Sequence, residues 1–334
     1  MAPGDQEPPD AWTAELEGIR RALRTLPFKT MEEANAFFAQ RVAAYNAQPQ
    51  TDLSGLSPIQ MRELLAGDWE SRGPLRLNAD LAPAELDASI FLVNARRFVE
   101  ALLEAGAVRL TEKGYLPHAF VAVLLDRFRW PGPYLEEVRA VCRVINEADV
   151  RPLHITRVVL EIARLVRRRS GAIRVTREGR RLVAEEHVGE LFALLFRTYF
   201  RGFNLSYVDS LDDASDIQYV VPYALWVVSQ LDDRWWPPDA LAKRVLPPGV
   251  HRAVAQERPD WQGVPLTATY LAMRRLLDPF ADFGVLEARP QAVEPPQVSA
   301  WNEFRKGSLC DRLLRFEFGA DPPKARGLNL RVVR

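Results

Sequence analysis

The sequence predicts a mainly α-helical protein of the α+β class, in which a helical N-terminal segment precedes three units with short β-hairpins. Two observations favour this class. Apolar residues recur at three- and four-residue spacing over most of the chain, which is typical of amphipathic helices. Short runs rich in β-branched residues, bounded by Gly or Pro, interrupt the helical pattern, most clearly between residues 165 and 176.

Composition limits the possible partners. With 334 residues the chain has room for two or three small domains. Its 44 Lys and Arg residues balance 44 Asp and Glu residues, so any basic surface must be local. The sequence shows neither a secretory signal nor an apolar run long enough to span a membrane. We therefore expect a cytoplasmic protein without a membrane partner, in which Cys142 and Cys310 are small buried side chains.

The N-terminal part is expected to be structural. Residues 1–10 are rich in Pro and acids and are expected to be disordered. Residues 11–79 form a helical segment. Thr30 and Glu33 have the spacing of a capping box, and Ser57 and Gln60 repeat the device. We find no catalytic chemistry in this segment.

Two related units are predicted next, at 80–131 and 132–210. The first has a helix that ends at Gly106, a short strand at 107–111 and a further helix. The second has a helix at 153–162 and two strands, 165–169 and 172–176, joined by Ser170-Gly171. Helix, hairpin and helix in this order are typical of a winged helix. Residues 108–114 and 173–179 are similar in character, which indicates an internal repeat.

A third unit is predicted at 217–318. Helices at 220–231, 237–245 and 267–280 precede strands at 285–288 and 298–304, which is again the winged-helix order. Residues 310–316 are predicted to return to helix. Residues 319–334 form a basic tail with four Lys or Arg residues beyond Pro322.

Two segments carry a family resemblance. Leu110–Gly114 and Val175–Gly179 resemble the LT-x-x-G wing exit of bacterial winged-helix proteins such as MarR- and PadR-type regulators. The wider arrangement, with Gly55–Pro58, Leu110–Leu116 and the basic hairpin, resembles a group of uncharacterised bacterial proteins. The resemblance implies a tandem winged-helix protein and carries no activity with it.

The sequence offers no local signature of catalysis. The four histidines are far apart and do not form HExxH or another metal-ligand spacing, and neither a Gly-rich phosphate loop nor a GxSxG elbow is present. We therefore predict a non-enzymatic protein, with no catalytic residues, no metal and no cofactor.

The basic stretch from Arg151 to Arg181 is the candidate binding site, because ten arginines there face only two acids. Arginine offers forked donors that match phosphate. We predict binding to double-stranded DNA, with the helix reading bases and the hairpin contacting the backbone. The alternative is a protein–protein interaction scaffold, in which Glu185, Glu186 and Glu190 pair with the arginines internally. The oligomeric state is left open. The predicted nucleic-acid-binding residues are Thr156, Arg157, Arg164, Arg167, Arg168, Arg169, Arg174 and Arg177.

Overall fold

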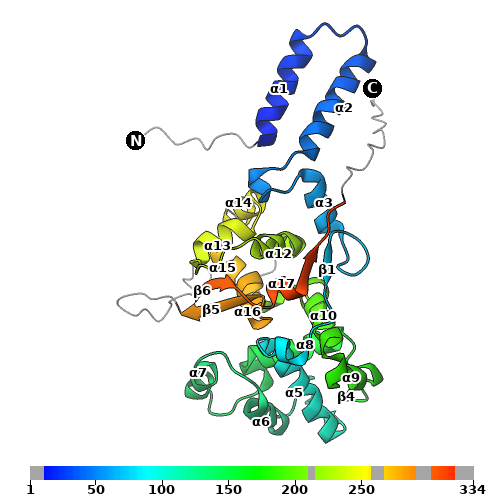
Figure 1. Ribbon diagram of the computed structural model, residues 1–334. Coiled ribbons are helices and arrows are strands. Elements are labelled where there is room, and N and C mark those ends of the chain that lie inside the picture. Colours follow the sequence, from blue (N-terminus) through cyan, green and yellow to red (C-terminus); the bar gives the residue numbers. More distant parts are fainter. Residues whose placement is uncertain (1–10, 210–214, 257–266, 291–301, 320–334) are drawn as a thin grey trace, which may run out of the picture. The chain divides into compact units, whose positions relative to one another are not determined.

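The computed structural model describes residues 11–209, 215–256, 267–290 and 302–319 (Figure 1). Two compact units are present, residues 1–66 with 318–334, and residues 67–317. Helices dominate the described residues and the strands form small antiparallel sheets, so the predicted α+β class is confirmed. The predicted disordered start and nearly all of the basic tail lie outside the described residues. Within them, no helix combines the length and apolarity required to cross a membrane.

In the first unit, side-chain caps set the helix starts. Thr30 Oγ1 accepts a hydrogen bond from the Glu33 amide at 3.1 Å, and Glu33 Oε2 accepts one from the Lys29 amide at 2.7 Å. Ser57 and Gln60 form a reciprocal pair, in which each side chain accepts a hydrogen bond from the backbone amide of the other residue, at 3.2 and 2.9 Å. The capping box predicted at Ser57 is thereby confirmed, whereas at Thr30 only the hydroxyl cap forms as predicted and Glu33 binds the Lys29 amide in place of the Thr30 amide. The helices of this unit are α1 (Ala11–Thr25), α2 (Met31–Ala47), the 3-10 turn η1 (Thr51–Leu53) and α3 (Pro58–Ala66).

The second unit begins with strand β1 (Leu75–Leu77) and a central group of elements. This central group has a helix, a short strand, further helices, a hairpin and a last short helix. Its members are α4 (Pro83–Leu86), α5 (Ile90–Ala105), β2 (Val108–Arg109), α6 (His118–Arg127), α7 (Tyr134–Val141), η2 (Glu147–Asp149), α8 (Arg151–Ile162), β3 (Val166–Arg169), β4 (Ala172–Val175) and α9 (Arg177–Leu182).

One sheet contains strands from both of the predicted units, 80–131 and 132–210. The strand order is β2-β4-β3, with Val108 opposite Ile173 and Arg168 also opposite Ile173. Val108, Val166 and Ile173 are 7%, 1% and 0% exposed and form the buried face of this sheet. The strand that directly precedes the first wing-exit segment, Leu110–Gly114, is therefore the third strand beside the hairpin and not part of a separate unit.

The predicted basic hairpin is confirmed. Its two-residue turn consists of Ser170 and Gly171, whose φ angles are 51° and 71°. Two successive positive φ angles match the right-handed twist of the flanking strands. Thr176, which follows β4, caps α9, because its Oγ1 accepts a hydrogen bond from the Gly179 amide at 3.0 Å.

The aromatic-rich segment at 185–203 is a packing element. It is divided into the 3-10 turn η3 (Glu185–His187), α10 (Val188–Arg197) and the π-turn η4 (Thr198–Gly202), followed by the 3-10 turn η5 (Leu205–Val208). Phe192, Phe196 and Phe200 are at most 1% exposed. The ring of Phe196 packs edge-on against Phe283 with a centroid distance of 5.2 Å. This helix therefore forms the core shared by the central and C-terminal elements.

The C-terminal group repeats the order of the central group. Trp236, which follows the helix at 221–229, forms a β-bridge with Phe304 of the last strand through two backbone hydrogen bonds of 2.7 and 2.9 Å. In the same way, β2 follows α5 and pairs with β4. The elements are α11 (Ser215–Tyr219), α12 (Val221–Ser229), α13 (Pro238–Val245), α14 (Pro248–Gln256), α15 (Ala268–Ala272), the π-turn η6 (Met273–Leu277), α16 (Asp278–Asp282), β5 (Leu286–Pro290) and β6 (Asn302–Lys306).

Two predictions at the end of this group need comment. The predicted helix at 310–316 is wrong in its second half, because α17 covers only Cys310–Leu313 and strand β7 (Leu314–Phe316) follows. Strand β7 pairs with β1, with Leu75 opposite Phe316, and this distant partner decides its conformation. Of the predicted strand at 298–304, residues 298–301 lie outside the described residues.

Candidate nucleic-acid interface

Four arginines share the outward side of the β2-β4-β3 sheet. Side chains alternate between the two sides of a strand, and Val108, Val166 and Ile173 occupy the buried side. The register therefore places Arg109, Arg167, Arg169 and Arg174 together on the opposite side, and all four are exposed. We call these four residues the arginine face. Ala172 lies at its centre, opposite both Arg109 and Arg169.

The arginine face is not neutralised within the described residues. Its four side chains form neither an ion pair nor a hydrogen bond with any described residue. Arg167 lies directly opposite Arg174, and like charges at such a position destabilise a sheet. A purely structural sheet gains nothing from this arrangement. An anionic partner would offset the repulsion.

The hairpin of the C-terminal group provides an internal comparison. Its outward arginines are paired across the strands: Arg289 with Glu303 at 2.8 Å, and Arg305 with Glu287. The corresponding outward pairs of the central hairpin are Arg167 with Arg174 and Arg169 with Ala172. The two hairpins therefore differ in charge pattern, and in the central one the outward arginines face no acid across the strands.

Arg168 is separated from the arginine face although it is adjacent in sequence. It lies on the buried side, opposite Ile173, and its guanidinium pairs with Glu161 at 2.8 Å. The exposed residues Arg164 and Arg177 flank the sheet. Arg164, Arg167 and Arg168 line a hollow of about 430 Å³ with Glu161, Val166 and Thr176. The hollow places three predicted site residues together, but one of them is already paired with a carboxylate.

Helix α8 corrects the predicted base-reading role. Thr156 and Arg157 are each 2% exposed, and only Arg151 and Ile162 at the two ends of the helix are exposed. Thr156 Oγ1 donates to the Pro152 carbonyl at 2.8 Å. The prediction that Thr156 and Arg157 face a DNA groove is wrong in this structure, because their neighbours enclose both side chains.

A fully buried carboxylate explains the position of Arg157. Glu147 Oε1 accepts hydrogen bonds from Arg157 Nε at 2.5 Å and contacts His154 Nδ1 at 2.6 Å, while Oε2 accepts one from the Leu116 amide at 2.6 Å. Burial alone would raise the pKa of Glu147. The bonds from His154, Leu116 and Arg157 outweigh burial and hold the pKa of Glu147 below its usual value.

The downstream acids neutralise a different arginine. Glu190 pairs with Arg181 at 3.0 Å, and Glu178 pairs with the same guanidinium at 2.7 Å. The bond with Arg181 holds the pKa of Glu178 below its usual range, and bonds with His187 and Arg181 lower the pKa of Glu190. Glu185 and Glu186 form no ion pair with a described residue. Internal pairing therefore removes Arg157, Arg168 and Arg181 from the predicted basic surface and leaves the arginine face.

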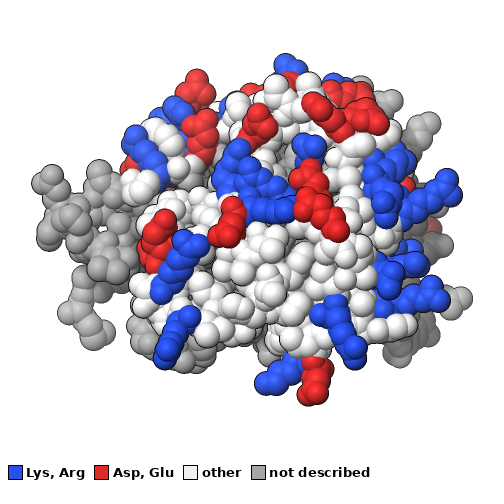
Figure 2. All heavy atoms as spheres, turned by 90° about the horizontal axis from the view of Figure 1, so that it is seen from below, with Lys and Arg blue, Asp and Glu red and all other residues white. Residues whose placement is uncertain are grey.

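The charge outside this patch is mixed. Figure 2 shows acidic and basic side chains interspersed around broad uncharged areas on one side of the molecule. This agrees with the net charge of zero, and a binding surface for an anion must be local. In the described part of the chain, three or more metal-ligating side chains do not gather in one place. Cys142 and Cys310 are free thiols there.

Sequence reasoning missed Arg109. It belongs to β2, more than fifty residues before the hairpin, and only the strand pairing brings it beside Ala172. The signal in the sequence that could have pointed to Arg109 was the similarity between residues 108–114 and 173–179. Both segments begin in strands of the same sheet, β2 and β4, and then leave it, so their similarity reflects a shared structural position.

Part of the central group is similar to a known sequence family. A family described as the Y4jL N-terminal domain matches residues 87–188, a range that encloses α5 to α9 in one piece. The uncharacterized protein y4jL of Sinorhizobium fredii (strain NBRC 101917 / NGR234) is 37% identical over 75 residues, which are 22% of this chain and 34% of that protein. The chain thus matches about one third of the length of that relative. No solved structure matches. The resemblance to uncharacterised bacterial proteins is confirmed for this part.

Proposed function

We propose that the chain is a non-enzymatic DNA-binding protein that contacts the phosphate backbone of double-stranded DNA through the arginine face. Residues 87–188 would form one winged-helix-like module, in which α8 is the third main helix and β3–β4 is the wing. The C-terminal group, with its bridge from Trp236 to Phe304, would be a second module of the same plan. The module boundary at 87–188 is supported by the range that the family matches.

The arginine face is the observation that carries the proposal. Guanidinium groups donate two parallel hydrogen bonds to phosphate oxygens. Facing residues on neighbouring strands lie about 5 Å apart, and alternate residues along one strand about 7 Å apart. The four side chains therefore present a compact cationic surface to an approaching duplex, since none of the four pairs with a described carboxylate.

The proposal excludes base reading by α8. Its Thr156 and Arg157 are enclosed, and contacts with phosphates carry no direct sequence information. We therefore expect similar affinity for unrelated duplexes and a steep dependence on salt. Any residual preference would come from arginines that enter a narrow minor groove.

The decisive experiment compares matched hairpin variants. Binding of the full chain to a labelled duplex is measured by fluorescence anisotropy at several salt concentrations. Arg167→Gln with Arg174→Gln removes two cations from the central hairpin, and Arg289→Gln with Arg305→Gln removes two from the C-terminal hairpin. Each phosphate contact contributes about 0.9 to the slope of log K against log salt, so the first variant should lose about 2 from the slope and the second nothing.

Two neighbouring residues sharpen the comparison. Arg169 lies on the arginine face and Arg168 on the buried side. Arg169→Gln should lower affinity and slope, whereas Arg168→Gln should leave the slope unchanged. Equal losses in both, or none in the Arg167/Arg174 variant, would remove the arginine face from DNA binding. Absence of duplex binding by the wild-type chain at low salt would favour a protein partner for this surface.

A further inference from the structure

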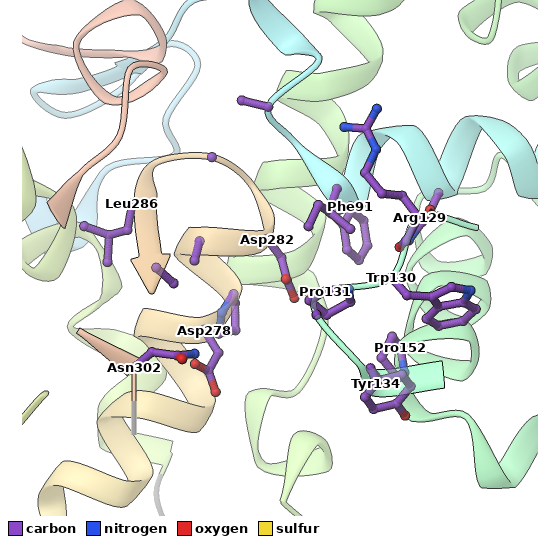
Figure 3. A pocket seen from close by; sticks show the side chains of 18 of the residues that line it. Phe91, Arg129, Trp130, Pro131, Tyr134, Pro152, Asp278, Asp282, Leu286 and Asn302 are labelled. Atoms are coloured by element: carbon purple, nitrogen blue, oxygen red, sulfur yellow. Dashed lines mark hydrogen bonds between the residues drawn. The ribbon is translucent and has the colours of Figure 1, made fainter. Parts of the chain in front are cut away.

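A large pocket lies within the second unit, between the central and C-terminal groups. Its volume is about 770 Å³, within the range of small-molecule sites. Residues from the start of α5, the 129–134 segment and α8 line one side, while α16 and the following strand line the other (Figure 3). The pocket contains none of the four arginines of the arginine face, so a ligand here would be independent of phosphate contacts.

Aromatic side chains form much of the wall. Trp130 and Tyr134 stack with a centroid distance of 5.6 Å and an interplanar angle of 17°. Trp130 Nε1 donates to the Leu125 carbonyl at 2.9 Å, which fixes the indole. Phe91 and Trp235 also line the pocket. Aromatic faces carry a negative quadrupole and attract organic cations.

Two carboxylates enter the pocket from α16. Asp278 and Asp282 are four residues apart and therefore lie on the same side of the helix, and Figure 3 shows both side chains directed toward the cavity. Asp278 pairs with Arg274 at 3.2 Å, and its side chain is 27% exposed. The Asp282 carboxylate has no hydrogen bond or ion pair with a described residue.

The pKa values reflect this setting. Burial and, to a smaller extent, the nearby Asp278 charge raise the pKa of Asp282 to about 7, although the Arg274 charge acts in the opposite direction. Burial likewise raises the pKa of Asp278, against Arg274. Tyr199, buried beside them, has a pKa raised by burial and by the Asp282 charge. An ionised Asp282 therefore lacks a counter-ion within the described residues.

The remaining charged groups of the wall have other roles. Arg129 Nη1 donates to the Asp87 carbonyl at 2.7 Å, and in Figure 3 its guanidinium extends away from the two aspartates. Glu287 is exposed and pairs with Arg305. Arg151 is exposed at the start of α8. Among the described carboxylates that line the pocket, that of Asp282 has no hydrogen bond or ion pair with a described residue.

We propose that this pocket binds an organic cation, an amine with an apolar or aromatic body, and that Asp282 is its counter-ion. The ammonium group replaces the missing partner of Asp282, and the body of the ligand lies against Tyr134, Phe91 and Pro152. A neutral ligand of the same shape leaves an ionised Asp282 without compensation, and an anion adds repulsion. Recognition thus depends on the ligand charge.

Matched probes test the proposal on the full chain by calorimetry at pH 7.5. Tryptamine is the cationic probe. Phenethylamine and benzylamine are smaller amines, which test binding to a cavity too narrow for an indole ring. The indole analogues 3-methylindole, which is neutral, and indole-3-propionate, which is an anion, share the body of tryptamine. We expect an amine to bind at least tenfold more tightly than either analogue.

Variants and the pH dependence of binding test whether the amine contacts Asp282. Asp282→Asn keeps the shape of the side chain and should lower amine affinity at least tenfold, whereas Asp126→Asn, at a side chain 80% exposed outside the pocket, should leave it unchanged. Because a proton competes with the amine for Asp282, whose pKa is about 7, wild-type affinity should fall roughly 75-fold between pH 7.5 and pH 5, and Asp282→Asn should remove that dependence. Thermal unfolding in the absence of ligand verifies that each variant is folded.

Three results would overturn the proposal. The first is equal affinity for tryptamine and 3-methylindole. The second is tighter binding of indole-3-propionate, which would assign the ligand to Arg151. The third is absence of binding by all three amines at a ligand concentration of about 1 mM, which corresponds to a binding free energy weaker than about 4 kcal/mol. None of these results bears on DNA binding.

Discussion

The buried pair of Glu147 and Arg157 leads to a sharp prediction about stability. Glu147 is 0% exposed and Arg157 is 2% exposed, with the Nε and Oε1 atoms 2.5 Å apart. Arg157→Met keeps an unbranched apolar stem similar to that of arginine and removes the guanidinium with its charge. Breaking a buried pair from one side costs about 3–5 kcal/mol. His154 and the Leu116 amide still contact Glu147, so we expect a loss of about 3 kcal/mol, at the lower end.

A double-mutant cycle separates the pair from its neighbours. Glu147→Gln keeps an acceptor for the Leu116 amide, and combining it with Arg157→Met removes both charges. The free energy of unfolding, measured by urea denaturation followed by circular dichroism, should show the double variant more stable than Arg157→Met alone, with a coupling of about 2 kcal/mol. A loss below about 1 kcal/mol in Arg157→Met would refute the reasoning, and Arg157 would again be available for DNA.

Three further predictions concern other parts of the molecule. Gly179→Ala should destabilise the protein by about 3 kcal/mol in the same denaturation assay, because the new Cβ would lie 2.1 Å from the Leu165 carbonyl oxygen, whereas Gly18→Ala, with open space around it, should be neutral or stabilising. The pKa of Asp282 is raised to about 7, so its contribution to stability is largest near pH 4 and is lost as pH rises to 7; Asp282→Asn should therefore raise the free energy of unfolding by about 2 kcal/mol at pH 8 and not at pH 4, and an equal effect at both pH values would contradict the burial of this group. Glu161→Gln should raise duplex affinity two- to threefold in anisotropy titrations, because it releases Arg168 from its pair; an unchanged or weaker affinity would show that Arg168 cannot reach a phosphate.

Local signals in the sequence were sufficient for several elements. The hydroxyl of Thr30 and the carboxylate of Glu33 set a helix start that depends only on neighbouring residues. The same holds for the Ser170-Gly171 turn, because the conformation of a two-residue loop is set by its own residues. These predictions required no knowledge of distant contacts.

Distant partners decided the features that the sequence did not reveal. Helical spacing placed Arg157 opposite the apolar stripe of its helix, which usually means solvent. Instead, Arg157 is buried and pairs with Glu147 from a neighbouring 3-10 turn. In the same way, β7 became a strand because β1 lies beside it. Burial and strand pairing are properties of the tertiary structure, and periodicity within one segment cannot supply them.

The candidate site combines both kinds of information. The hairpin arginines could be identified from their density in the sequence, but their division between two sides of the sheet required the strand register. The pocket was beyond prediction, because Phe91, Tyr134 and Asp282 come from segments far apart in the chain. Asp282 in particular resembles an ordinary helical acid until its neighbours are known.

Site-specific cross-linking tests the arginine face most directly. Ala172 lies at the centre of this surface, between Arg109 and Arg169, and replacing it with a photoreactive benzoylphenylalanine preserves every arginine. Val141, 84% exposed on α7, is the matched control position. With a radiolabelled duplex at low salt, irradiation should produce a cross-link from position 172 that high salt abolishes, and little from position 141. A duplex that binds but cross-links equally from both positions, or only from 141, would contradict the proposed interface.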